Sequence, residues 1–211
     1  MMDLFLKGGP VMWPLLVTSL VALTVIFERL YFSVREYSRR DPAGVARIFS
    51  AVEQGDLVAA QIEASRSSDG LARVLGHALQ HRNVSFANAM QQAANCELQR
   101  FNRGISLLDT IVTLAPLEGL FGTVTGMIHA FGLLGANELG APAAITGGIA
   151  EALIATAFGL LIAMVSILPF NFLNTRLERA RHEIETAAAQ LELLLLQTAK
   201  NKNEASHSIA H

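Results

Sequence analysis

Residues 105–134 read ISLLDTIVTLAPLEGLFGTVTGMIHAFGLL, and residues 145–173 read ITGGIAEALIATAFGLLIAMVSILPFNFL. Both stretches lie inside residues 104–175, which contain no Lys or Arg at all. Each stretch is longer than the ~20 apolar residues that an α-helix needs to cross the hydrocarbon core of a bilayer. The sequence therefore predicts two transmembrane helices, joined by residues 135–144.

A third apolar run lies near the amino terminus, at residues 10–27. A helix over this run would be ~27 Å long, which is sufficient to cross the hydrocarbon core. A cleaved signal peptide would need basic residues before the run and a small-residue cleavage site after it. Here only Lys7 precedes the run, whereas Arg29 and Arg35 follow it, so the charge order is reversed. We therefore expect an all-α membrane protein with three transmembrane helices.

The basic residues are distributed unequally between the segments outside the expected spans. Of the sixteen Lys and Arg residues, one lies in residues 1–9, ten in residues 28–104, none in residues 135–144 and five in residues 174–211. Cytoplasmic segments of membrane proteins carry an excess of Lys and Arg. We expect the amino terminus and the 135–144 loop on the periplasmic side, and the two basic segments in the cytoplasm.

The overall composition narrows the possible functions. Hydrophobic residues make up 52% of the chain and charged residues only 16%, compared with about 25% charged residues in soluble domains. The net charge of −2 gives no support for nucleic-acid binding. Cys96 is the only cysteine, which excludes an internal disulfide, and its helical spacing favours a packing role. His77 and His81 lie four residues apart, but no third ligand follows at suitable spacing, so no metal site is expected.

The two expected cytoplasmic segments have helical patterns. Asp41-Pro42 is a typical helix start, and Ser85 is a candidate cap for a helix that runs straight into the second span. Residues 174–200 place leucines among charged residues at helical spacing, which predicts an amphipathic helix, and residues 201–211 are expected to be disordered. Neither segment contains a nucleotide-binding loop or a hydrolase or metalloprotease motif, so we expect no enzymatic activity and no cofactor.

Carboxyl groups inside a membrane span are energetically costly and usually functional. Glu151 lies about six residues, or ~9 Å, into the third span from its outer end, and Glu118 lies midway along the second span. Asp109 carries less weight, because it lies near the inner end of the second span, within reach of cytoplasmic water. Glu151 and Glu118 are therefore candidate functional residues.

Small residues form a stripe on each of the last two spans. At 100° per residue, the second span places Gly119, Gly122 and Gly126 on one face, and the third span places Gly148, Ala152, Ala155 and Gly159 on one face. Such stripes let the backbones of two helices approach closely within a membrane.

Thr123 and Thr156 lie at the same expected depth in these two spans. Thr123 is 11 residues before Leu134, and Thr156 is 11 residues after Ile145, which places both ~16 Å down in a core ~30 Å thick. With Glu151 above them, the two hydroxyls could line a hydrated ion path. The alternative is that each hydroxyl bonds to a carbonyl of its own helix and that the small residues only pack.

Two longer motifs contain these residues: APLEGLFGTVTGMI at residues 115–128 and GIAEALIATA at residues 148–157. Their order and their positions in the spans resemble the MotA/TolQ/ExbB proton-channel family, most closely its ExbB and TolQ branches. The three spans and the helical cytoplasmic segment fit this family over most of the chain. The resemblance implies that Thr123, Glu151 and Thr156 line a pore.

The resemblance also implies an assembly and a function. Such subunits form homopentamers in the bacterial inner membrane, and their second and third spans line a central pore. Two copies of a single-span ExbD- or TolR-like partner lie in that pore, and an aspartate of the partner takes up and releases protons. This proton flow energises a TonB- or TolA-like protein that acts on the outer membrane. The transported ion is expected to be H⁺, although the threonines leave Na⁺ open.

One position departs from the family, which usually has an aliphatic residue where this chain has Glu118. This carboxyl could relay protons towards the cytoplasm, or it could face a packed interface as a protonated hydrogen-bond donor. Our hypothesis is that Glu118 modulates proton exit. Two other functions remain open at this point: a MotA-like flagellar stator subunit, whose branch has four spans, and a structural membrane scaffold that conducts no ions.

Overall fold

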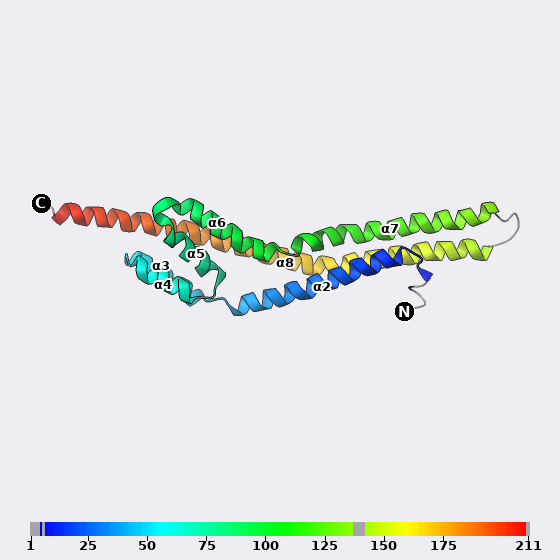
Figure 1. Ribbon diagram of the computed structural model, residues 1–211, viewed down its shortest axis with the longest axis horizontal. Coiled ribbons are helices and arrows are strands. Elements are labelled where there is room, and N and C mark those ends of the chain that lie inside the picture. Colours follow the sequence, from blue (N-terminus) through cyan, green and yellow to red (C-terminus); the bar gives the residue numbers. More distant parts are fainter. Residues whose placement is uncertain (1–4, 6, 137–141, 210–211) are drawn as a thin grey trace. The chain divides into compact units, whose positions relative to one another are not determined.

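The computed structural model describes residue 5, residues 7–136 and residues 142–209 of the 211-residue chain. The helices of this part of the chain are labelled in Figure 1. In chain order they are α2 (Met12–Ser38), α3 (Pro42–Glu53), α4 (Leu57–Arg66), α5 (Gly70–Gln80), α6 (Arg82–Asn102), α7 (Ile105–Ala136) and α8 (Pro142–Ile209). The expected all-α fold class is thus observed for the described residues.

The chain divides into two compact units, each with its own packed core. The membrane unit comprises Met1–Tyr31 and Gly104–Leu173, and the polar unit comprises Phe32–Arg103 and Asn174–His211. Helices α2 and α8 contribute to both units, because the boundaries between the units fall within these helices.

Among the described residues, three helices are long and apolar enough to cross a membrane. The candidate segments are Met12–Ser38, Ile105–Gly132 and Thr146–Thr198. This number agrees with the three spans that the sequence predicts. Helix α2 continues well beyond Phe27, where the apolar run ends. Residues 137–141, in the middle of the expected periplasmic loop, lie outside the described residues.

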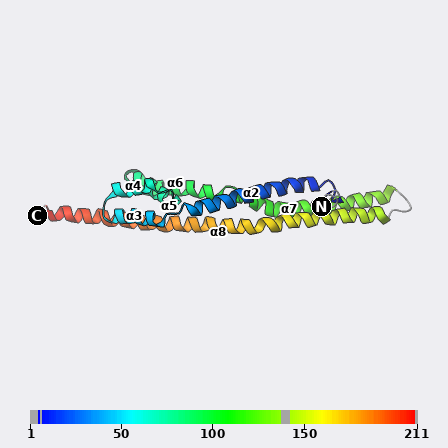
Figure 2. The ribbon, with the colours of Figure 1, turned by 90° about the horizontal axis from the view of Figure 1, so that it is seen from below.

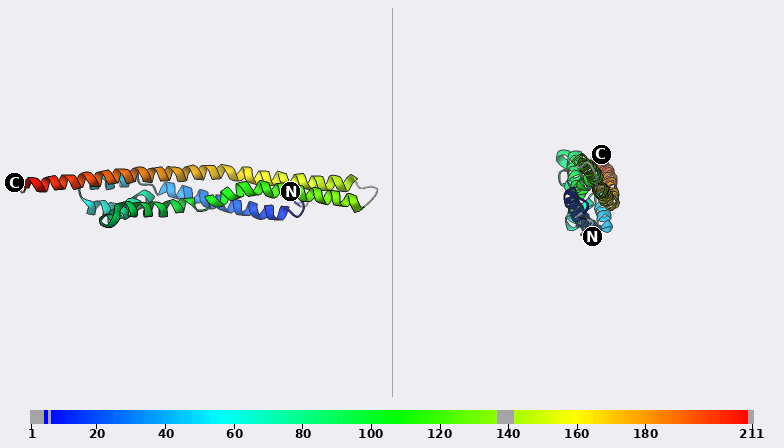
Figure 3. Two further views of the ribbon diagram at one scale, coloured as in Figure 1. Left: turned by 90° about the horizontal axis from the view of Figure 1, so that it is seen from above. Right: turned by 90° about the vertical axis from the view of Figure 1, so that its right-hand side faces the viewer.

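Helix α8 is continuous from Pro142 to Ile209 (Figure 3). The third expected span and the expected amphipathic segment are therefore parts of one helix. The expectation of disorder in residues 201–211 is wrong for residues 201–209, which are helical. Pro169 lies inside α8. Neither Gly nor Pro occurs after it, so the later part of α8 has no residue with a strong tendency to end a helix.

In the membrane unit, α7 and the part of α2 up to Tyr31 pack against the early part of α8 (Figures 1 and 2). A small buried cluster of Val11, Met12, Leu15 and Ala155 joins the start of α2 to α8. Many large apolar side chains of this unit remain exposed, as expected for helices that contact lipid or other transmembrane helices.

In the polar unit, the short helices begin at aspartate caps. An Asp41 carboxylate oxygen accepts a hydrogen bond from the Gly44 N–H at 2.8 Å, and Pro42 occupies the first turn of α3. Asp56 caps α4 in the same way, accepting a bond from the Ala59 N–H at 2.9 Å. These bonds satisfy backbone donors that the first turn of a helix leaves unpaired.

Helix α6 differs from the sequence prediction at its end. As predicted, Ser85 leaves the helical conformation, and its hydroxyl accepts a bond from the Asn88 N–H at 3.4 Å. The predicted straight run into the second span is wrong, because α6 ends at Asn102 and α7 begins at Ile105. Gly104 interrupts the helix with a φ of +76°, a left-handed conformation that glycine adopts without steric cost.

Helix α8 supplies one side of the core of the polar unit. Ile184, Ala187 and Leu191 of α8 are buried against apolar residues of α3 to α6. Figure 2 shows these shorter helices beside the later part of α8. The buried positions follow the helical spacing of apolar residues in the amphipathic segment, as the sequence predicts.

Cys96 does not have the packing role that its spacing suggested, because its side chain is exposed. The next residue, Glu97, occupies the buried position instead, with a side chain that is 8% exposed. Its carboxylate accepts hydrogen bonds from Arg73 at 2.8 Å and from Arg100 at 2.9 Å. A buried carboxylate is tolerated where charged donors compensate for lost hydration.

Candidate functional site

The small-residue faces of α7 and α8 lie directly against each other. A Cβ atom added to Gly122 would lie 2.5 Å from the Ala155 Cβ, and one added to Gly126 would lie 2.9 Å from the Ala152 Cβ. Further along, a Cβ on Gly148 would lie 2.7 Å from the Ala130 Cβ. The two backbones are therefore too close for side chains at the glycines, as the stripes in the sequence suggested.

The same close approach places Thr156 on the backbone of α7. Its hydroxyl donates a hydrogen bond to the Gly119 carbonyl at 2.9 Å and also lies 3.2 Å from the Ala152 carbonyl of its own helix. A Cβ on Gly119 would meet the Thr156 Cα at 3.1 Å, and a Cβ on Gly159 would meet the Gly119 Cα at 2.9 Å. Thr156 thus links the two helices at a point where their backbones lie close together.

Thr123 has a different environment. Its hydroxyl donates to the Leu120 carbonyl of its own helix at 2.6 Å. The side chain is half-buried and lines a shallow depression on α7 together with the apolar side chains of Val124, Met127, Ile128 and Phe131. Both threonine hydroxyls therefore bond to carbonyls, and Thr123 makes no hydrogen bond to the other candidate residues among the described interactions.

Glu118 makes a hydrogen bond between two helices of the membrane unit. The Thr18 hydroxyl of α2 donates to Oε1 of Glu118 at 3.0 Å. The second carboxyl oxygen, Oε2, is buried, and no hydrogen-bond donor or acceptor of the described residues reaches it. Sequence reasoning did not identify Thr18, whose only signal is a hydroxyl within an apolar run.

Glu151 lies against the turn that precedes α2. A Cβ on Gly9 would overlap Oε1 of Glu151 and would lie 2.5 Å from its Cδ and 2.9 Å from its Cγ. Gly9 has a φ of +73°, in the left-handed region. Sequence reasoning did not identify this contact either, although Gly8-Gly9-Pro10 is a recognisable turn sequence.

Within one chain, the four candidate polar residues thus contact different neighbours. Glu118 contacts α2, Glu151 contacts the turn before α2, Thr156 contacts α7, and Thr123 contacts its own helix. Their chemistry suits proton or cation binding, because carboxyl groups exchange protons and hydroxyls both donate and accept hydrogen bonds. The described residues contain no group of three or more His, Cys, Asp or Glu side chains that could hold a metal ion.

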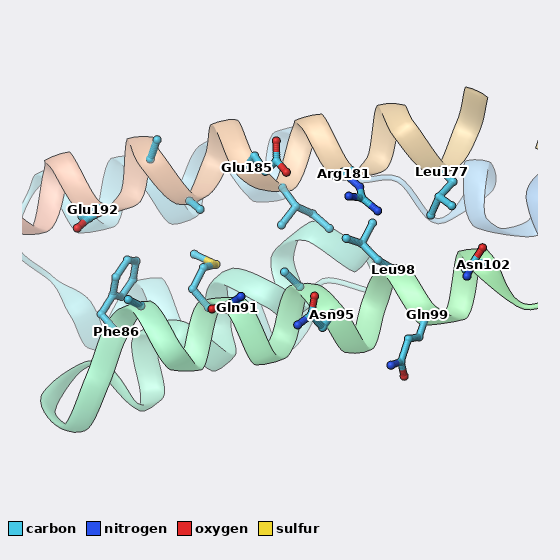
Figure 4. Close-up of a pocket in the computed structure, with 16 residues that line it drawn as sticks. Phe86, Gln91, Asn95, Leu98, Gln99, Asn102, Leu177, Arg181, Glu185 and Glu192 are labelled. Atoms are coloured by element: carbon cyan, nitrogen blue, oxygen red, sulfur yellow. The ribbon is translucent and has the colours of Figure 1, made fainter. Parts of the chain in front are cut away.

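The polar unit contains a groove of about 660 Å³ between α6 and α8 (Figure 4). Apolar residues of its lining include Phe86, Leu98 and Leu177, and Arg181 and Glu185 of α8 add charge. Elsewhere in this unit, the ring centroids of His77 and His81 lie 4.5 Å apart, with the ring planes tilted by 32°.

Comparison with known proteins finds a matching family and several relatives. The sequence model described as the MotA/TolQ/ExbB proton channel family matches residues 59–186, which is more than half of the chain. An ExbB-like biopolymer transport protein of Synechocystis sp. is 39% identical over 201 residues, which cover 92% of this chain and 78% of that protein. The biopolymer transport protein ExbB of Neisseria gonorrhoeae is 37% identical over 54% of this chain and 50% of its own length. The Tol-Pal system protein TolQ of Haemophilus influenzae is 40% identical over 42% of this chain and 39% of its own length.

Proposed function

Because this chain belongs to the MotA/TolQ/ExbB proton channel family, we propose that it is the proton-channel subunit of an ExbB/TolQ-like motor in a bacterial inner membrane. With an ExbD- or TolR-like single-span partner, it uses the proton motive force to energise a TonB- or TolA-like protein. That protein in turn acts on the outer membrane, for example in biopolymer or nutrient import.

The observation that carries this proposal is the pairing of α7 and α8. Two helices long and apolar enough to span a membrane pack through small residues and carry Thr123, Glu151 and Thr156. Ionisable and hydroxyl side chains are expensive in hydrocarbon unless they serve an ion path or a polar partner. Moving one proton across 100 mV releases ~2.3 kcal/mol, which is the energy available to the motor per proton.

The partly exposed side chain of Thr123 supports an assembled pore. In the proposed homopentamer, α7 and α8 of each copy surround a central pore that holds two copies of the partner. Thr123 is half-buried in the single chain, which leaves its side chain available to such a lumen. Charge asymmetry supports a periplasmic amino terminus, because residues 28–104 and 174–211 carry fifteen of the sixteen basic residues.

Two alternative functions are less well supported. A MotA-like stator subunit would have four spans, whereas the described residues contain three candidate spans. A scaffold without ion conduction would explain the packing of the glycines but would give no reason for a carboxyl at Glu151.

The test is proton flux through the purified complex. We expect proteoliposomes containing this chain and its single-span partner to take up protons when a membrane potential is applied. Glu151→Ala and Thr156→Ala should each abolish uptake and leave the oligomer intact, whereas Glu53→Ala, at an exposed position of α3, should leave both unchanged. Proton uptake at wild-type rates in Glu151→Ala would refute a role of Glu151 in the proton path. Na⁺ flux in place of proton uptake would identify Na⁺ as the transported ion.

The hypothesis that Glu118 modulates proton exit has its own test. Glu118→Leu should change the flux or its pH dependence, because it removes the carboxyl that Thr18 contacts. Glu118→Gln keeps a hydrogen-bonding side chain but cannot exchange a proton, so it separates a relay from a packing role. Unchanged flux and pH dependence in Glu118→Leu would rule the hypothesis out.

A further inference from the structure

The turn before α2 contacts the Glu151 carboxyl so closely that only a glycine fits at residue 9. Gly9 has a φ of +73°, which residues with a Cβ rarely adopt. The missing side chain leaves room for Glu151, whose Cγ, Cδ and Oε1 all lie within 3 Å of the position that a Cβ would occupy. The bare backbone of Gly9 therefore forms one wall of the space that holds the Glu151 side chain.

This turn is held firmly in place by its neighbours. The Met12 N–H donates to the Gly9 carbonyl at 3.2 Å, and the Trp13 N–H donates to the Pro10 carbonyl at 3.3 Å. The side chains of Val11 and Met12 are buried, at 7% and 2% exposure. A wall that is anchored in this way fixes the position of a side chain more precisely than a mobile loop would.

The residues on either side of Gly9 also contact α8 and α7. A Cβ on Gly8 would lie 3.1 Å from Cγ2 of Ile154, one turn of α8 after Glu151. Val11 Cγ1 would lie 3.4 Å from a Cβ on Gly122, which packs against Ala155 of α8. Residues 8–12 thus cover the Glu151 side of α8 as one continuous segment.

From this geometry we infer that residues 8–12 form a cover over the Glu151 carboxyl and that Gly9 is a positioning residue for proton transfer. This inference rests on the proposed function, in which Glu151 belongs to the proton path. The cover limits the directions from which a proton reaches the carboxyl and holds the carboxyl in one place. A methyl group at residue 9 would displace the carboxyl from that place.

The test compares two glycines that both have a φ in the left-handed region. Gly55 has a φ of +80°, and the nearest atom to a Cβ there is 3.5 Å away. Gly55→Ala therefore introduces backbone strain alone, whereas Gly9→Ala introduces strain and a collision with Glu151. Both variants are purified as full-length chains in complex with the single-span partner, and proton uptake is measured as a function of external pH.

We expect Gly9→Ala to reduce proton uptake about tenfold or more, because a displacement of order 1 Å can cost up to about a hundredfold where groups must be precisely placed. Its pH profile should also shift relative to that of wild type. Gly55→Ala should keep the wild-type profile. Equal effects of the two substitutions, or an unshifted profile in Gly9→Ala, would overturn the inference.

A double substitution tests the collision itself. Glu151→Ala removes the Cγ, the Cδ and the carboxyl oxygens that the added methyl group would meet, so adding Gly9→Ala to it should change assembly and thermal stability little. Strain in the turn alone predicts the same loss from Gly9→Ala in both backgrounds. If Gly9→Ala by itself prevents assembly, recovery of assembly in the double variant supports the inference, and no recovery overturns it.

A chemical measurement keeps this inference separate from the proposed function. Dicyclohexylcarbodiimide modifies protonated carboxyls in membranes, and mass spectrometry follows its reaction with Glu151 in the same complexes. We expect the reaction to be severalfold faster in Gly9→Ala than in wild type and Gly55→Ala, because the displaced carboxyl is no longer covered. An unchanged or slower reaction would overturn the inference even in a complex that conducts protons. Conversely, a wild-type complex without proton uptake would refute the proposed function but would leave this measurement valid.

Discussion

At the scale of single residues, Glu118 shows how a carboxyl is accommodated between apolar helices. Only one of its oxygens has a partner among the described residues, the Thr18 hydroxyl at 3.0 Å. A half-buried carboxyl with one buried, unpartnered oxygen carries a free-energy cost, and a far larger one when it is ionised. The hydrogen bond to Thr18 reduces this cost and at the same time ties α2 to α7.

Removal of the Thr18 hydroxyl should therefore destabilise the membrane unit. We expect Thr18→Val to lower the free energy of unfolding in detergent by about 1 kcal/mol, since hydrogen bonds between membrane helices average about 0.6 kcal/mol and an orphaned polar atom adds to the loss. Thr18→Ser keeps the hydroxyl and is the matched control. If Thr18→Val proves as stable as Thr18→Ser, the hydrogen bond does not contribute to stability.

At the scale of helices, the contact between α7 and α8 depends on small residues along both faces. Gly122 and Gly126 lie against Ala155 and Ala152 with no space for a further methyl group. Van der Waals packing drives helix association in a membrane, where lipid tails remove most of the hydrophobic driving force. The close approach also lets the Thr156 hydroxyl reach a carbonyl of the neighbouring helix.

A methyl group added to this contact should lower the stability of the chain, and a compensating substitution should restore it. We expect Gly122→Ala to destabilise the chain by roughly 1–3 kcal/mol, the usual effect of overpacking, as measured by unfolding in detergent. Adding Ala155→Gly removes the methyl group that it would meet and should restore most of the loss. Gly132→Ala is the control, because a Cβ there meets nothing within 4 Å; a comparable loss in that variant would contradict the packing explanation.

The caps of the short helices give a second prediction at this scale. Asp56→Ala should lower the stability of the polar unit by about 1 kcal/mol, because the Ala59 N–H loses its acceptor. Asp56→Asn retains an oxygen acceptor and should cost much less. Thermal unfolding monitored by circular dichroism distinguishes the two, and equal losses would show that charge rather than capping stabilises this end of α4.

At the scale of the whole molecule, the charge distribution predicts how the chain is oriented in the membrane. Cys96 is exposed and lies within residues 28–104, which carry ten of the sixteen basic residues. If this segment is cytoplasmic, a membrane-impermeant maleimide should label Cys96 in inside-out vesicles and not in right-side-out vesicles. This cysteine is the only one in the sequence, so wild-type protein can be used.

The control moves the single thiol to the segment that is expected on the other side of the membrane. In a Cys96→Ser background, Asn137→Cys places a single thiol in the segment 135–144, which is expected to be periplasmic. This variant should react in right-side-out vesicles only. The opposite labelling pattern in the two proteins would show that the chain is inserted the other way round.

Much of the fold could be predicted because each signal is local. The three candidate spans are visible as apolar runs, the helix start at Asp41-Pro42 follows from local capping chemistry, and the small faces of α7 and α8 follow from helical periodicity. The errors concern places where local signals were weak. Gly104 interrupts a pattern that was expected to continue, and α8 continues where disorder was expected.

The sequence by itself determined the number of candidate spans, the family and the identity of the polar residues within the spans, because an apolar background makes each charge or hydroxyl conspicuous. Only the tertiary structure decided what those residues contact. Glu118 meets Thr18, and Glu151 meets Gly9, each at least a hundred residues away along the chain. Periodicity specifies which face of a helix a residue occupies, but it does not specify which distant segment packs on that face. That choice depends on the close approach of three helices, which only the folded chain fixes.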